Sequence, residues 1–226
     1  MADIMLVGAH PDDIEFAMGG TAVKLSKKYS IVVVVLTKGE MGTRGSPLER
    51  EKEVKDAAGF IGAELELLDF KDCHIHDDGP SRLKIANIIR KHKPKIVFCP
   101  YFEHKTFHRD GISHPDHSAT GTLVRHALRF AKFKKINLDY EPHNAQRLIY
   151  YMVPRNKMPT FVADITPHIK EWEEYAKKHK SQLTEGLFER LKHYRKTAGA
   201  FIGVDYGETF IVEEPLEMDS DYLFKM

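Results

Sequence analysis

The chain has 226 residues, and its 34 Lys and Arg nearly balance its 33 Asp and Glu, which gives a formal net charge of +1 with the 13 His neutral. This balance excludes a polybasic nucleic-acid tail and an acidic solvating chain. With 42% hydrophobic and 30% charged residues, the chain can bury a core and is not disordered. Its two cysteines, Cys73 and Cys99, are too few for a disulfide scaffold or a Cys-rich zinc knuckle.

The sequence also argues against a membrane protein. Its longest aliphatic stretch, residues 31–36, is too short to cross a bilayer, and its N-terminus lacks the basic region of a signal peptide. We therefore expect a cytoplasmic protein with neither membrane nor nucleic-acid partners.

Short β-branched runs alternate with helix-length amphipathic segments, a pattern typical of α/β folds. Pro47 favours the first turn of its helix, and Pro94 stops the helix that precedes it. Short strands joined by single helices pair in parallel through right-handed crossovers, so we expect a Rossmann-like three-layer fold with a mostly parallel sheet. The predicted elements are, in chain order, strand 4–8, helix 15–28, strand 31–36, helix 47–61, strand 65–68, helix 81–92, strand 96–99, helix 115–132 and strand 147–153.

The remainder of the chain extends this pattern. Residues 137–143 are expected to be a connection, two further helices follow Pro167 and end near Gly199, and residues 209–213 are expected to form a final edge strand. The sequence contains no internal repeat and no Gly/Ser-rich linker. We therefore expect residues 1–226 to form one domain.

Polar and metal-capable residues follow several predicted strands. The working surface of such folds lies at the carboxyl ends of the strands. His10, Asp12 and Asp13 come directly after the first strand, residues 37–45 (TKGEMGTRG) after the second, and the segment after the fourth leads to residues 114–117 (HPDH). Because these strand ends meet at one edge of the sheet, we expect one site there.

Two of these segments have metal-ligand spacing. His10 and Asp13 lie three positions apart at a strand-to-helix turn, and His114 and His117 form an H-x-x-H at a helix start, where such positions face the same side. A catalytic zinc site needs three protein ligands and one open position, and two His and one Asp from these segments can supply the ligands. Zinc lowers the pKa of a bound water to roughly 7, so a neighbouring carboxylate, Asp12, suffices as base.

An imidazole left outside the ligand set can also act in the reaction. His114, held protonated by Asp116, can stabilise an oxyanion or protonate a leaving amine. Simpler structural roles stay open at this point, because Asp12 and Asp13 can cap the following helix and the H-x-x-H can start a helix without metal.

Other histidines of this region divide into two groups. His104 and His108 lie just before the candidate site and can contact substrate or metal. The others are expected on the surface, namely His74, His76, His92 and His126.

Other catalytic motifs are missing from the sequence. No G-x-G-x-x-G dinucleotide fingerprint follows the first strand, and the series Gly39, Gly42, Gly45 has the wrong spacing and no Walker Lys-Ser pair. There is no G-x-S-x-G, and neither cysteine has the setting of a nucleophile. These observations count against a nucleotide-dependent Rossmann enzyme, whereas a non-catalytic sugar- or metal-binding module stays an alternative.

Three stretches together resemble a known family. They are residues 8–15 (GAHPDDIE), residues 36–44 (LTKGEMGTR) with Arg50 and Glu53 following, and residues 114–117 (HPDH). In this order they resemble the LmbE-like (PIG-L) zinc-dependent N-deacetylases of N-acetylglucosaminyl compounds. Further likeness extends through residues 100–103, 179–182 and 202–208, so that the resemblance covers nearly the whole chain.

The resemblance implies a Rossmann-like fold and a role for each matching residue. It implies Zn²⁺ held by His10, Asp13 and His117, although sequence does not distinguish zinc from another divalent metal such as Fe²⁺. It further implies a homo-oligomer, a trimer or hexamer. The remaining implied roles are Asp12 as general base, His114 as the group opposite it, Asp116 as the residue that orients His114, and Arg50 as a sugar contact.

Within the family, the resemblance is strongest to the N-acetylglucosaminyl-malate deacetylases of bacillithiol biosynthesis, which have a similar tail at residues 203–216. Alternative substrates are a chitooligosaccharide, another GlcNAc glycoconjugate or a thiol-conjugate amide. Residues 104–113 are an insertion relative to several relatives and can cover the site or reshape its aglycone pocket; the role of His179 is open. The cations available for an anionic malate are Arg44, Lys105, Arg109 and Arg155.

Overall fold

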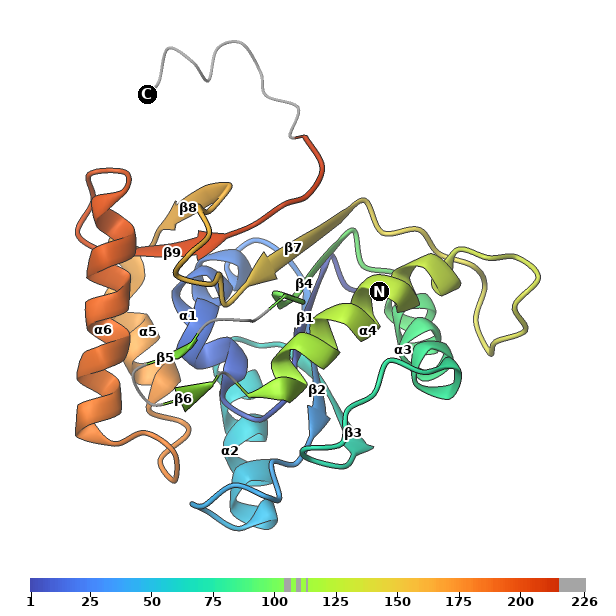
Figure 1. The fold of residues 1–226 in the computed structure, drawn as a ribbon, viewed down its shortest axis with the longest axis horizontal. Coiled ribbons are helices and arrows are strands. Elements are labelled where there is room, and N and C mark those ends of the chain that lie inside the picture. Colours follow the sequence, from blue (N-terminus) through green and yellow to red (C-terminus); the bar gives the residue numbers. More distant parts are fainter. Residues whose placement is uncertain (104–106, 109–110, 113, 216–226) are drawn as a thin grey trace.

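A computed structural model of the chain describes residues 1–103, 107–108, 111–112 and 114–215. Its centre is a five-stranded parallel sheet in the order β3-β2-β1-β4-β7 (Figure 1). The strand order reverses between β1 and β4, which is the point where such sheets open a crevice for ligands. The strands are β1 (Ile4–Gly8), β2 (Ile31–Thr37), β3 (Glu64–Phe70), β4 (Ile96–Pro100) and β7 (Arg147–Tyr151).

Helices cover both faces of this sheet. The alternating side chains of β1 divide between two apolar clusters: Met5 and Val7 pack with α3 and α4, whereas Ile4 and Leu6 pack with α1 and α2. The predicted α/β, Rossmann-like fold with a mostly parallel sheet is therefore confirmed. The helices are α1 (Asp13–Ser26), α2 (Pro47–Phe60), α3 (Gly79–His92), α4 (Pro115–Ala131), α5 (Ile169–Ala176) and α6 (Glu185–Ala200), with a 3-10 turn at Thr166–His168.

The helix starts that bear on the site follow from local sequence. Helix α2 begins at Pro47, and a capping box closes its first turn, in which Ser46 Oγ accepts the backbone N–H of Glu49 and the Glu49 carboxylate accepts the N–H of Ser46. Helix α4 begins at Pro115 with His114 as its cap. Helix α1 begins at Asp13, two residues before the predicted start.

The part after β7 differs from the prediction. The expected edge strand at 209–213 is instead β9 (Gly207–Phe210), which pairs antiparallel with an unpredicted strand, β8 (Phe161–Asp164). A bridge between Ile211 and Tyr150 then joins this small sheet to β7. Two further short strands, β5 (Phe107–His108) and β6 (Gly111–Ile112), pair within the insertion.

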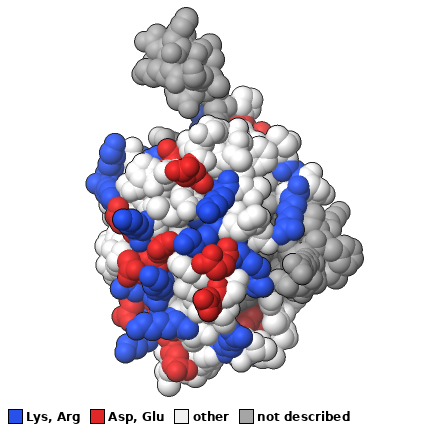
Figure 2. All heavy atoms as spheres, turned by 90° about the vertical axis from the view of Figure 1, so that its left-hand side faces the viewer, with Lys and Arg blue, Asp and Glu red and all other residues white. Residues whose placement is uncertain are grey.

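Helices α5 and α6 form an outer layer against α1 (Figure 1). Apolar side chains pack between α5 and α6, with Trp172 and Ala176 of α5 against Leu191 of α6. On the outer face of this layer, Lys and Arg are interspersed with Asp and Glu (Figure 2), and one such ion pair joins Lys192 to Glu173 at 3.0 Å. Among the described residues, no helix is both long and apolar enough to span a membrane.

Candidate metal centre

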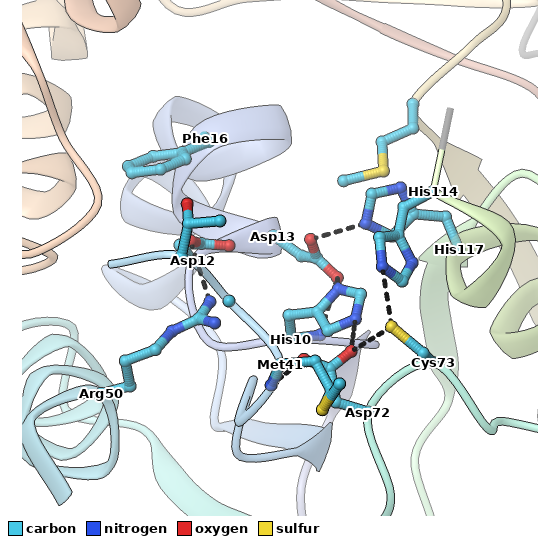
Figure 3. A pocket seen from close by; sticks show the side chains of 13 residues that line it. His10, Asp12, Asp13, Phe16, Met41, Arg50, Asp72, Cys73, His114 and His117 are labelled. Carbon is cyan, nitrogen blue, oxygen red and sulfur yellow. Dashed lines mark hydrogen bonds and ion pairs between the residues drawn. The ribbon is translucent and has the colours of Figure 1, made fainter. Parts of the chain in front are cut away.

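A cavity of about 440 Å³ opens at the carboxyl ends of β1, β2 and β3 and at the start of α4 (Figure 3). Acidic, imidazole, thiol and apolar side chains line this cavity, so it offers both charged groups and apolar surface to a ligand. Its lining consists of His10, Asp12, Asp13, Phe16, Met41, Gly42, Thr43, Arg50, Asp72, Cys73, His114, His117 and Met152.

The three predicted metal ligands come together in this cavity. One ring nitrogen each of His10 and His117 and one carboxylate oxygen of Asp13 lie within 4.8 Å of one another. Nε2 of His117 is 3.0 Å from Oδ1 of Asp13, and Nδ1 of His10 is 3.7 Å from Oδ2. The backbone N–H groups of Ala9 and His10 donate to Oδ2 at 2.8 and 2.9 Å, which fixes the Asp13 carboxylate at the end of β1.

Two carboxylates, those of Asp72 and Asp116, face Nε2 of His10. Asp72 was not predicted as a site residue, and Asp116 was expected to orient His114. Nε2 of His10 lies 3.0 Å from Oδ1 of Asp72 and 3.5 Å from Oδ2 of Asp116. Asp72 is itself held by the loop after β2, since its Oδ2 accepts the N–H of Met41 and its own N–H is bound by the Glu40 carboxylate. This arrangement leaves Nδ1 of His10 to face the cavity, as a metal ligand must.

The electrostatics of these groups indicate a site that stabilises a cation. Burial lowers the pKa of His10, but its hydrogen bonds to Asp116 and Asp13 and the nearby carboxylate charges raise it to about 11. Burial raises the pKa of Asp13, but His117 and His10 outweigh it and hold that pKa well below its ordinary value. Two imidazoles and one carboxylate surrounded by further carboxylates form a donor set that suits zinc or another divalent transition metal.

Asp12 lies beside this donor set without joining it (Figure 3). It occupies the N-cap position of α1 with a backbone φ of 107° but makes no capping hydrogen bond with its side chain, and its carboxylate lies 3.2 Å from Nη2 of Arg50. Burial, followed by the charge of Asp13, raises the pKa of Asp12 to about 6, although Arg50, His179 and His10 act in the opposite direction. A carboxyl group with this pKa next to a metal site is suited to proton transfer.

His114 faces the cavity from the start of α4. Its Nδ1 accepts the backbone N–H of Asp116 at 3.3 Å, and its Nε2 lies 3.6 Å from Sγ of Cys73. Burial, with the charges of His10 and His117, lowers the pKa of His114. The contact with Asp116 places the proton of a neutral His114 ring on Nε2, and the protonated His114 expected from the sequence stays a prediction.

Asp116 contacts three residues at the edge of the cavity: Cys73, His10 and His114. Its carboxylate accepts the backbone N–H of Cys73 at 2.8 Å and faces His10, whereas its contact with His114 runs through the backbone. The role of Asp116 in orienting the His114 ring stays a prediction.

Of the two predicted substrate contacts, Arg50 is buried and Arg44 is exposed. Arg50 reaches the cavity from α2 but is buried, with both terminal nitrogens bonded to protein oxygens. Arg44 is exposed in the loop after β2, where its carbonyl accepts a hydrogen bond from Gln182. Arg155 is also exposed and bonds to the hydroxyl of Tyr194. Substrate contact by these arginines stays a prediction.

The other histidines singled out in the sequence, where their side chains are described, are each either exposed or buried. The prediction of a surface position is confirmed for His74, His76 and His126 and is wrong for His92, which is buried because Glu66 on β3 pairs with its Nε2 at 2.8 Å. His179 is fully buried, with Nε2 3.3 Å from Glu15 at the start of α1. Several predictions on the insertion and the tail fall outside the described residues, namely those on His104, Lys105, Arg109, Leu216 and the side chain of His108.

Comparison with known proteins agrees with this geometry. A model of the PIG-L family, described as GlcNAc-PI de-N-acetylase, matches residues 5–128. The diacetylchitobiose deacetylase of Thermococcus kodakarensis is 28% identical over 223 residues, covering 92% of this chain and 80% of the relative. A Bacillus anthracis protein named probable N-acetyl-alpha-D-glucosaminyl L-malate deacetylase 2 is 27% identical over 223 residues, covering 84% and 86%.

A solved structure resembles the whole chain. The conserved protein TT1542 from Thermus thermophilus superposes with a TM-score of 0.86 at 35% identity, covering 97% of this chain and 98% of that one. Sequence motifs, fold, cavity and family match therefore agree, and the chain belongs to the PIG-L (LmbE-like) family of de-N-acetylases.

Proposed function

We propose that the protein is a metal-dependent hydrolase that removes the N-acetyl group from an N-acetylglucosaminyl conjugate. Its two candidate substrates are N-acetylglucosaminyl-malate of bacillithiol biosynthesis and a chitooligosaccharide. The observation that carries this proposal is one cavity in which three ligand side chains converge and a fourth group, Asp12, stays outside the ligand set. Membership of a de-N-acetylase family supports the same reaction.

His10, Asp13 and His117 are the residues that would hold the metal, Zn²⁺ or another divalent transition metal such as Fe²⁺. When bound, such an ion lowers the pKa of water to roughly 7 and polarises an amide carbonyl. The carboxylates around His10 support this assignment, because they compensate positive charge in a largely buried site.

Asp12 is proposed as the general base. Its carboxylate takes a proton from the attacking water, whose oxygen adds to the acetyl carbonyl carbon. The carbon–nitrogen bond then breaks, and the proton passes to the sugar nitrogen, so that acetate and a free amine leave. The position of Asp12 beside the ligands, with its side chain held by Arg50, supports this role.

His114 is proposed as the donor that stabilises the oxyanion formed during this reaction. Because its Nδ1 accepts the N–H of Asp116, the neutral ring carries its proton on Nε2, which faces the cavity. An N–H donor already aimed into the cavity stabilises the negative charge that develops on the carbonyl oxygen.

The size and lining of the cavity support a sugar conjugate as substrate. A volume of about 440 Å³ lies within the roughly 300–1,000 Å³ of small-molecule sites. Phe16, Met41 and Met152 supply apolar surface against which a sugar ring and an acetyl methyl group can pack. The chain is about equally similar in sequence to a diacetylchitobiose deacetylase and to a protein named as a probable GlcNAc-malate deacetylase. The comparisons therefore support a chitooligosaccharide and the malate conjugate equally as substrates.

The other classes considered from the sequence have less support. A dinucleotide would place its pyrophosphate at the start of the helix after β1, where Asp12 and Asp13 would repel it. A non-catalytic sugar-binding module would have no use for a carboxylate held beside the ligands. The homo-oligomer and the cytoplasmic location expected from the sequence stay predictions.

The test is acetate release from a panel of acceptors, with metal content measured on the same preparation. The panel contains GlcNAc-malate, diacetylchitobiose, another GlcNAc glycoside and a thiol-conjugate amide. Acetate production that requires bound metal supports the hydrolase, and the acceptor with the highest kcat/KM identifies the substrate class. Binding of these sugars without any acetate release by metal-loaded protein would instead support the binding module.

A further inference from the structure

Cys73 places a thiol in the cavity, outside the three proposed metal ligands (Figure 3). Its side chain is exposed, and Sγ lies 3.6 Å from Oδ1 of Asp72 and 3.6 Å from Nε2 of His114. The other cysteine, Cys99, is fully buried in β4. Because the sequence holds only these two cysteines, Cys73 is the thiol that a ligand in the cavity can reach.

The backbone holds Cys73 in this position under strain. Its φ of 65° lies in the left-handed region, which glycine adopts freely and a residue with a Cβ adopts rarely. The carboxylate of Asp116 fixes this turn by accepting the backbone N–H of Cys73 at 2.8 Å. Strained positions of this kind cluster at functional sites, so the thiol itself calls for a role.

Asp72, Cys73 and His114 form a second set of metal-capable side chains, separate from the first. One donor atom of each lies within 4.8 Å of the donor atoms of the other two. Zinc bonds of about 2.3 Å to sulfur and about 2.0–2.2 Å to nitrogen or oxygen, at tetrahedral angles, place such donors about 3.5 Å apart. The two separations of 3.6 Å from Sγ match this spacing.

The charges around the thiol favour a bound cation over a covalent role. Desolvation, followed by the charge of Asp72, raises the pKa of Cys73, which disfavours a free thiolate nucleophile. Oδ1 of Asp72 can bind a cation while it accepts the N–H of His10, because a carboxylate oxygen has two lone pairs. A set of thiol, imidazole and carboxylate suits a borderline or soft cation such as Zn²⁺ or Co²⁺.

We propose that Asp72, Cys73 and His114 form a second site for a thiophilic divalent cation, and that its occupation inhibits the enzyme by withdrawing His114 from the reaction. The inhibition rests on the proposed function, in which His114 stabilises the oxyanion, whereas the binding of the cation does not depend on it.

Binding at this site changes two protons. The thiol proton of Cys73 passes to solvent, and the neutral His114 ring gives up its proton on Nε2 and takes one on Nδ1. In that tautomer the ring no longer accepts the backbone N–H of Asp116, a hydrogen bond that is already long at 3.3 Å. The second site is therefore expected to be weaker than the first and to fill after it.

The binding experiment titrates metal-free protein with Co²⁺ under anaerobic conditions. A thiolate bound to Co²⁺ absorbs in the near ultraviolet by charge transfer, whereas the first site contains no sulfur. We expect wild type to bind two equivalents, with this absorption appearing during the second. Cys73→Ser and Cys73→Gly should bind one equivalent without the absorption, and glycine also relieves the backbone strain at this position. Cys99→Ala, which removes the buried thiol, is the matched control and should behave as wild type.

The activity experiment measures acetate release by each protein with Zn²⁺ at the first site alone and at both sites. Filling the second site should lower kcat of wild type and of Cys99→Ala by about 10²- to 10³-fold, the usual cost of losing an oxyanion donor. The same Zn²⁺ concentration should leave Cys73→Ser and Cys73→Gly at the rate that each shows with one equivalent.

Three results would count against the proposal. Absence of the charge-transfer absorption in wild type, or its persistence in Cys73→Gly, would overturn the second site. Unchanged kcat in wild type whose spectrum shows thiolate ligation would overturn the inhibition. If wild type with one equivalent of metal releases no acetate from any acceptor, the proposed function fails by itself, and the Co²⁺ titration still decides whether the second site exists.

Discussion

Nε2 of His10 lies 3.0 Å from Oδ1 of Asp72, a residue 62 positions further along the chain. His10 follows β1 and Asp72 follows β3, two strands that are separated by β2 in the sheet. The carboxylate fixes the imidazole so that its other nitrogen faces Asp13 and His117. A carboxylate in this position also raises the basicity of a histidine ligand.

Asp72→Asn is therefore expected to weaken metal binding by about 10- to 100-fold, because the amide neither orients the His10 ring as firmly nor supplies negative charge. Competition with a chromogenic zinc chelator measures this affinity. Asp69→Asn is the matched control, since Asp69 lies near the end of β3, three positions before Asp72, but is exposed and pairs with Lys84. Equal affinities of the two variants would remove Asp72 from the metal site.

Glu208 is expected to be critical for folding rather than for catalysis. Its buried carboxylate lies 2.7 Å from Arg195 and accepts the backbone N–H groups of Gly20 and Thr21 in α1. Glu208→Gln leaves the Arg195 charge buried and uncompensated, which costs about 3–5 kcal/mol of unfolding free energy. Urea unfolding measures this loss.

The control for this prediction is Glu51→Gln, which removes a surface carboxylate that pairs with Lys38 and Lys55. Exposed pairs contribute little, so its unfolding midpoint should stay near that of wild type. If Glu51→Gln lost as much unfolding free energy as Glu208→Gln, burial of the carboxylate would not explain the loss at Glu208.

Asp3 is expected to contribute to stability in a way that depends on pH. Hydrogen bonds from Lys95 and Ser30 lower its pKa from 3.8 to about 2. Because the folded pKa is the lower one, this stabilisation is complete above pH 3.8 and is lost as the pH falls towards 2. The thermal midpoints of wild type and Asp3→Asn should therefore differ most near neutral pH and converge in acid. A constant difference over this range would contradict the assignment.

The buried strands could be predicted from sequence because their apolar runs are continuous. Strands β1, β2 and β4 lie within a residue of their predicted bounds. Strand β3 is longer than predicted, Glu64–Phe70 against 65–68, because this edge strand is partly exposed and polar side chains interrupt its apolar pattern. The pairing of β8 with β9 joins segments far apart in the chain, which local patterns do not reveal.

The site was predictable where its residues stand in short motifs. The set that the family resemblance implied, His10, Asp13 and His117, meets in one cavity. Asp72 and Cys73 were missed because they belong to no such motif, although Asp72 follows β3 by two residues and the rule that places sites at strand ends would have found it. The burial of His92 depends on Glu66 of a neighbouring strand, a contact that only the tertiary structure provides.

The most direct test of the account is Asp12→Asn, assayed for acetate release together with bound metal. Asparagine keeps the shape of the side chain but does not take up a proton, so we predict that metal content is unchanged while kcat falls by about 10²- to 10⁴-fold. An Asp12→Asn protein that binds metal and releases acetate at the wild-type rate would contradict the assignment of Asp12 as the base and the reaction built on it.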